Sequence, residues 1–217
     1  MNKNYIEVVP AILAKTKEEF EKKLIAVPSA NIIQIDIMDG RFVDNKTVSF
    51  DQISSLLPLQ KEIEYHLMVQ DPYLWIEAIP PLKKNIFQIH VEAVSPQEID
   101  EIIDLVEKKS AKLCFALNPD TPIEILNKLP DINHVLLMTV HPGKSGQQYI
   151  KEVENKISKL RKLKPDCIIE IDGGANESTS LSAIAAGANR IAMASAIFNS
   201  PNPDKQYIKF KNLFNQR

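Results

Sequence analysis

The chain has 217 residues, 44% of them hydrophobic, and a formal net charge of -2. That length and composition suffice for one sizeable core, so we expect a single domain over residues 1–217. The near-neutral charge, with one basic cluster of helical spacing at Lys156–Lys164, gives no reason to expect nucleic acid as a partner.

No window approaches the ~20 apolar residues of a membrane span, and Met1–Ala14 lacks the apolar centre of a signal peptide. We therefore expect a soluble, cytoplasmic protein with no membrane partner, and we expect it to form a homo-oligomer. Cys114 and Cys167 each lie in a short apolar run without metal-ligand or redox spacing, which predicts two small core residues.

Eight apolar runs of strand length follow one another along the chain. They are Ile6–Leu13, Ile32–Met38, Glu62–Val69, Ile86–Val91, Ala111–Leu117, His134–Val140, Cys167–Asp172 and Arg190–Ala194. Segments of helical periodicity lie between several of them, at residues 17–26, 96–109, 146–163 and 178–187. Since parallel strands need a crossover of helix length, this alternation predicts a parallel sheet.

Eight strand–helix units in about 220 residues match the size of a (β/α)8 TIM barrel. The alternative is a doubly wound open sheet, which usually carries a glycine-rich turn after its first strand. The segment PAILAKT (residues 10–16) contains no glycine, so the sequence favours the barrel.

Polar residues stand near the ends of most of these runs, where TIM-barrel active sites form. They are Asp36, Asp39, His66, His90, Asn118, Thr139, His141, Asp172 and Ser195. Among them, Asp36, His66 and Asp172 lie on strands that converge across a narrow barrel. Two carboxylates and an imidazole can bind a divalent cation, and two carboxylates can act as base and acid on opposite faces of a substrate. The alternative is three polar residues that are hydrogen-bonded separately.

Glycines and small residues mark the loops after the last three strands. The loops read HPGKSGQ (residues 141–147), IDGGA (171–175) and MASAIF (193–198). Small residues let backbone N–H groups approach an anion, and a short helix after the eighth strand would offer its positive end. Together the three loops predict a phosphate site.

These segments resemble the successive motifs of the ribulose-phosphate 3-epimerase family. The motifs are IDIMDGRFVDN, HLMVQDP, HVEA, LNPDTP, MTVHPGKSGQ, IDGGANEST and AGANRIAMASAIF, in family order. The resemblance implies an isomerase that interconverts D-ribulose 5-phosphate and D-xylulose 5-phosphate, or a related pair of ketohexose 6-phosphates. It implies Asp36 as general base and Asp172 as general acid. It also implies substrate and phosphate contacts at His66, Gly143, Lys144, Ser145, Gly146, Gly173, Gly174, Ala194 and Ser195.

The resemblance further implies a divalent metal of the zinc, manganese, iron or cobalt type, held by Asp36, His66 and Asp172. The sequence departs from the family at Gln34, where the family has a fourth ligand, histidine. An amide oxygen is a poorer ligand for zinc or iron than an imidazole, so we expect metal binding to be weakened or absent. The alternative function is a sugar-phosphate-binding barrel that has lost turnover or taken up another role.

Overall fold

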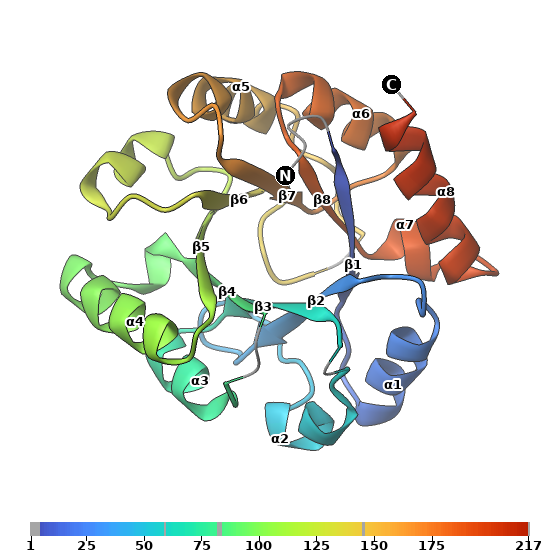
Figure 1. The fold of residues 1–217 in the computed structure, drawn as a ribbon, viewed down its shortest axis with the longest axis horizontal. Helices are drawn as coiled ribbons and strands as arrows, with labels where there is room; N and C mark the ends of the chain where they lie inside the picture. Colours follow the sequence, from blue (N-terminus) through green and yellow to red (C-terminus); the bar gives the residue numbers. More distant parts are fainter. Residues whose placement is uncertain (1–4, 59, 82–83, 145, 217) are drawn as a thin grey trace.

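Eight strands form a closed barrel in the computed structural model of the chain, which describes residues 5–58, 60–81, 84–144 and 146–216. The strands follow one another around the barrel in chain order, and the parallel pairing of β1 with β8 closes it (Figure 1). They are β1 (Glu7–Ile12), β2 (Ile32–Met38), β3 (Glu62–Met68), β4 (Asn85–His90), β5 (Lys112–Leu117), β6 (His134–Met138), β7 (Ile168–Asp172) and β8 (Arg190–Met193). The predicted TIM barrel and its eight strands are confirmed, and the open sheet is excluded.

Helices surround the barrel on its outside (Figure 1). The α-helices are α1 (Lys17–Ile25), α2 (Phe50–Ile53), α3 (Pro72–Ala78), α4 (Pro96–Lys108), α5 (Val153–Leu163), α6 (Glu177–Ala186), α7 (Ser195–Phe198) and α8 (Pro203–Asn215). Short 3₁₀ helices are η1 (Ser54–Leu56), η2 (Val91–Ala93) and η3 (Ile123–Lys128). In the described part of the chain, no helix combines the length and the apolar character that a membrane crossing requires.

Local sequence accounts for where these helices begin. In α4, Ser95 and Glu98 form a reciprocal capping box, and Pro96 occupies the first turn, where its missing N–H costs nothing. One face of α4 is apolar and is buried against the barrel through Ile99, Ile102 and Val106. The short helix α7 confirms the helix that the sequence predicts after the eighth strand.

The helix predicted over residues 146–163 is wrong in its first part, because α5 begins only at Val153. The Gln147 side chain donates hydrogen bonds to the carbonyl oxygens of His141 and Lys144. The backbone N–H of Ile150 donates to the Thr139 carbonyl. These contacts hold residues 146–152 in a loop that ends in a turn before α5, and the periodicity of their side chains cannot show this.

Side chains along each strand alternate between the barrel interior and the layer beneath the helices. On β2, the side chains of Ile33, Ile35 and Ile37 belong to the main hydrophobic core cluster. Gln34 and Asp36 occupy the alternate positions and therefore face the interior. The same period places His66 of β3 beside Asp36 in the parallel register. The polar residues of these runs thus point toward one another rather than toward water.

Candidate functional site

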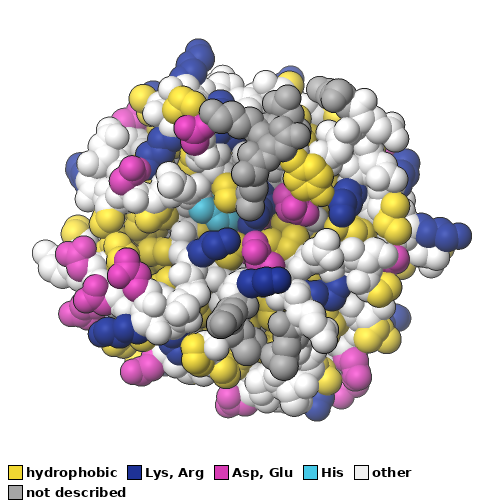
Figure 2. Space-filling model, viewed as in Figure 1, with side chains coloured by type: hydrophobic (Ala, Val, Ile, Leu, Met, Phe, Trp, Pro, Cys, Tyr) yellow, Lys and Arg dark blue, Asp and Glu magenta, His cyan; other side chains and the backbone are white. Residues whose placement is uncertain are grey.

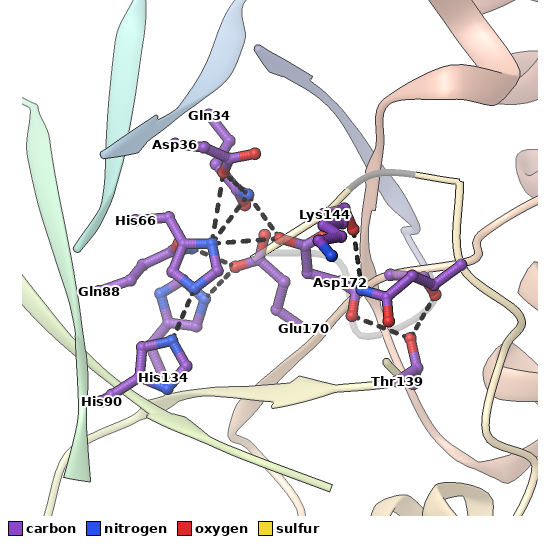
Figure 3. Close-up of polar contacts among 12 residues, drawn as sticks. Gln34, Asp36, His66, Gln88, His90, His134, Thr139, Lys144, Glu170 and Asp172 are labelled. Atoms are coloured by element: carbon purple, nitrogen blue, oxygen red, sulfur yellow. Dashed lines mark hydrogen bonds and ion pairs between the residues drawn. The ribbon is translucent and has the colours of Figure 1, made fainter. Parts of the chain in front are cut away.

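Two carboxylates and an imidazole meet at the carboxyl end of the barrel. The Nδ1 atom of His66 lies 3.3 Å from Asp36 Oδ1 and 3.2 Å from Asp172 Oδ2 (Figure 3). One donor atom from each of the three residues lies within 4.8 Å of the others. The structure therefore brings together the three residues that the sequence selects, and their donor atoms are close enough to share one cation.

Gln34 lies beneath this cluster and is completely buried. Its Nε2 donates hydrogen bonds of 2.8 Å to Asp36 Oδ1 and 2.7 Å to Asp172 Oδ2 (Figure 3). Its Oε1 has no hydrogen-bond partner among the described residues. The amide thus bridges the two carboxylates through its N–H groups. These donors stabilise part of the negative charge that a bound cation would otherwise stabilise.

Charge at the site is balanced mainly by His66. Burial by itself lowers the pKa of this imidazole, but hydrogen bonds and ion pairing with Asp172 and Asp36 outweigh burial and raise the pKa to about 10. In the absence of a metal ion, His66 is therefore an imidazolium near neutral pH. Two carboxylates facing each other are stabilised by this positive charge together with the amide N–H groups of Gln34.

A second histidine supports His66 from below. The rings of His90 and His66 are nearly parallel, at 19°, with centroids 5.1 Å apart, and their Nε2 atoms face each other at 3.0 Å. Burial lowers the pKa of His90, so its ring is neutral and can accept a hydrogen bond from the His66 imidazolium. Phe42 packs against the His90 ring at 4.8 Å, and Glu92 lies 3.4 Å from its Nδ1.

The loop after β7 approaches its neighbours so closely that it requires glycine. Gly173 has φ +113°, and a Cβ atom there would lie 2.3 Å from Val140 Cγ2. Gly174 has φ +61°, and its Cβ would lie 2.7 Å from the backbone nitrogen of Tyr149. Thr139 fixes the same turn, because its hydroxyl donates to the carbonyl oxygens of Asp172 and Gly173. The turn is therefore closely packed and hydrogen-bonded.

Replacing Gly173 by alanine should destabilise the fold by more than the same change at Gly146. Both glycines have positive φ, which costs a non-glycine residue about 1–3 kcal/mol. Only at Gly173 does the added Cβ also meet buried Val140, whereas nothing lies within 4 Å of a Cβ at Gly146. Thermal unfolding measures the difference. Equal Tm values for Gly173→Ala and Gly146→Ala would show that close packing does not determine this turn.

One pocket joins the carboxylate cluster to the glycine loops. Its lining includes all the described residues that the resemblance selects except Gln34, which lies below: Asp36, His66, Gly143, Lys144, Gly146, Asp172, Gly173, Gly174, Ala194 and Ser195. Ser145 lies outside the described residues. The first N–H groups of α7 have no intrahelical acceptor, and Ala194 at its N-cap makes no side-chain cap. The pocket thus has acid–base groups near one part of its lining and backbone donors near another.

Several residues that line the pocket were not predicted from the sequence. Met38, Met68 and Met138 line the pocket with their apolar side chains. Met38 and Met68 follow Asp36 and His66 by two residues on the same strands, and Met138 pairs in register with Asp172. The strand period of two could have identified them, because each shares its neighbour's inward direction.

Two other polar residues at strand ends, Asp39 and His141, contact loop residues and do not line this pocket. Asp39 accepts hydrogen bonds from the backbone N–H groups of Arg41, Phe42 and Gln70. His141 is exposed, with its Nδ1 3.8 Å from a carboxylate oxygen of Asp120. Neither side chain contributes to the cluster around Asp36.

Comparison with known proteins gives concordant matches. The model of the ribulose-phosphate 3 epimerase family matches residues 7–198. The ribulose-phosphate 3-epimerase of Synechocystis sp. is 34% identical over 210 residues, which cover 93% of this chain and 91% of that protein. The enzyme of the same name from Bacillus subtilis is 33% identical over 209 residues, covering 92% and 95%.

Solved structures show the same architecture at low sequence identity. KGPDC from Streptococcus mutans matches with a TM-score of 0.76 and 12% identity, over 98% of this chain and 98% of that chain. A 3-hexulose-6-phosphate synthase matches with a TM-score of 0.70 and 12% identity, over 95% and 98%. At these identities the likeness concerns the fold alone.

Proposed function

Because the chain belongs to the ribulose-phosphate 3-epimerase family, we propose that it is an isomerase acting at C3 of a ketose phosphate. The substrate pair is D-ribulose 5-phosphate and D-xylulose 5-phosphate, or two related ketohexose 6-phosphates. One observation carries the proposal: a single pocket contains two facing carboxylates together with the glycine loops after β6, β7 and β8. The carboxylates suit proton transfer, and the loops suit a phosphate.

Asp36 and Asp172 perform the proton transfers in this proposal. One carboxylate removes the C3 proton from one face of the substrate, and the other returns a proton to the opposite face. The N–H groups of Gln34 and the His66 ring contact both carboxylates and position them for these transfers. His90 holds the His66 ring in the orientation that points Nδ1 at both of them.

The residues present also fit a divalent cation. Asp36, His66 and Asp172 would hold it, and the unpartnered Oε1 of Gln34 is a further, weaker donor once the amide turns. When bound, such an ion supplies positive charge that stabilises negative charge developing on the substrate oxygens. Since the family histidine is Gln34 here, we propose that the ion binds more weakly than it does to four strong ligands.

Exchange of the C3 hydrogen with solvent tests the proposal. The protein is incubated with D-ribulose 5-phosphate in deuterium oxide, and the ketose phosphates are analysed by NMR. We expect deuterium at C3 and the appearance of D-xylulose 5-phosphate. If the sugar phosphate binds by calorimetry and no deuterium enters with either a pentulose or a hexulose phosphate, the binding-protein alternative holds instead. Gln34 in place of histidine is the observation that favours this alternative.

Phosphate recognition should depend on Lys144. This exposed side chain lines the pocket beside the glycine loops. Lys144→Gln should raise KM about 10-fold or more and leave kcat nearly unchanged, because a hydrogen bond to a charged group contributes about 1.5–3 kcal/mol. Lys151→Gln is the matched control, since Lys151 is also exposed and lies outside this pocket. Equal KM values for the two variants would show that Lys144 does not contact the substrate phosphate.

A further inference from the structure

A second polar cluster lies inside the barrel, toward the ends at which the strands begin. Cys114 of β5, His134 of β6 and Glu170 of β7 face one another there. Cys114 and Glu170 are completely buried, and His134 is 6% exposed. One donor atom from each residue lies within 4.8 Å of the others. None of the three lines the pocket described above.

Some polar atoms of this cluster have few hydrogen-bond partners or none among the described residues. Glu170 Oε2 accepts from Gln88 Nε2 at 2.9 Å and lies 2.8 Å from His134 Nε2 (Figure 3). The amide oxygen of Gln88 has no partner among the described residues. The other carboxylate oxygen, Glu170 Oε1, is paired only if Glu64 carries a proton and donates it. The Cys114 thiol has only a weak contact of 3.8 Å, with the carbonyl oxygen of Phe115. Unpartnered buried oxygens are costly, so the cluster favours a ligand that accepts their lone pairs.

Buried charged groups surround this cluster. Glu64 and Glu170 are buried carboxyl groups, and Arg190, which is also buried, pairs with Glu64. Burial raises the pKa of Glu64 to about 8, so Glu64 holds a proton near neutral pH.

We propose that Cys114, His134 and Glu170 bind a zinc-like divalent cation, with Gln88 Oε1 as the fourth donor after its amide turns. Thiolate, imidazole and carboxylate are the ligands that zinc prefers, usually four in number. Binding forms a metal–sulfur bond and releases the thiol proton to solvent. The site is distinct from the cluster of Asp36, His66 and Asp172, which contains no sulfur.

The rival way to satisfy these buried groups is a proton shared between Glu64 and Glu170, and this rival predicts that no metal binds.

Of the three members of this cluster, only His134 is in contact with solvent. Figure 2 views the molecule from the end at which the strands begin, and a histidine side chain is visible near its centre. His134 is the first residue of β6 and is slightly exposed, whereas His66 and His90 are completely buried. Entry past His134 would not pass through the substrate pocket.

Cobalt(II) tests the proposal, because a thiolate ligand gives a cobalt–sulfur charge-transfer absorption that oxygen and nitrogen ligands do not give. The full chain is stripped of metal with a chelator and titrated with cobalt chloride. We expect this absorption in the native protein, its loss in Cys114→Ser, and at least a 10-fold weaker cobalt affinity in His134→Gln. Cys167→Ser is the matched control, because Cys167 is also a buried free cysteine and should leave the absorption unchanged.

The pair of variants Asp36→Asn and Asp172→Asn separates this site from the substrate pocket, since both should keep the charge-transfer absorption. Absence of the absorption in the native protein would overturn the proposal, as would its persistence in Cys114→Ser or its loss in Cys167→Ser. If Cys114→Ser does not fold, the native and His134→Gln titrations decide the question. None of these results depends on whether the chain is an epimerase.

Discussion

Asp172→Asn and Asp36→Asn should each lower kcat by about 10²–10⁴-fold while the barrel remains folded. This range is typical for the loss of a general acid or base. Asparagine keeps the size of the side chain and can still meet the N–H groups of Gln34 through its amide oxygen, so we expect little change in Tm. Steady-state epimerisation and thermal unfolding together measure the two effects.

Solvent exchange tells the two carboxylates apart. If each one faces a different side of C3, each variant should retain deuterium exchange with only one of the two epimers, and the retained epimer should differ between the variants. Asp120→Asn is the control, since this carboxylate is 87% exposed and lies 3.8 Å from His141 Nδ1, outside the cluster around Asp36. Normal kcat in either asparagine variant, with normal kcat in the control, would refute a mechanism with two carboxylates.

Most of the fold could be predicted because its signals are local. The apolar runs have strand length, and the segments between them carry caps such as Ser95 and Glu98. Since the strands of a TIM barrel are parallel, polar residues near their ends, such as Asp36 and Asp172, could also be expected to converge. The segment at residues 146–152 was predicted wrongly because its conformation depends on contacts with Thr139 and His141, which no periodicity records.

The finer features of the site could not be predicted because they depend on pairing between strands. The register of β2 against β3 places Asp36 beside His66, and only the closed barrel brings Gln34 within reach of Asp172. The cluster around Cys114 draws on three different strands, and its members have no characteristic spacing in the sequence. Cys114 was therefore interpreted as a core residue. It is buried as predicted and packs in an apolar cluster with residues such as Ile86 and Leu136, and donor atoms of His134 and Glu170 also lie close to its thiol.

Gln34→His should strengthen metal binding at the carboxylate cluster by about 10–100-fold, the size of effect that even the partners of metal ligands commonly have. In the native chain, the Gln34 N–H groups satisfy Asp36 and Asp172, so a cation must displace those hydrogen bonds before it reaches the carboxylates. A neutral imidazole at this position would be a ligand itself. Manganese(II) is the appropriate probe, because it prefers oxygen and nitrogen donors to thiolates and so reports this cluster rather than Cys114.

Gln34→Leu is the control that separates the two effects of the substitution. It removes the amide N–H groups without adding an imidazole, so manganese affinity should rise in Gln34→His by more than in Gln34→Leu. If manganese affinity and C3 exchange rise together in Gln34→His, the native glutamine restrains an epimerase site. If affinity rises and exchange does not, the native amide is itself part of the working site, with its N–H groups and the His66 imidazolium supplying the positive charge. If manganese binds to neither the native protein nor Gln34→His, Asp36 and Asp172 act without a metal ion.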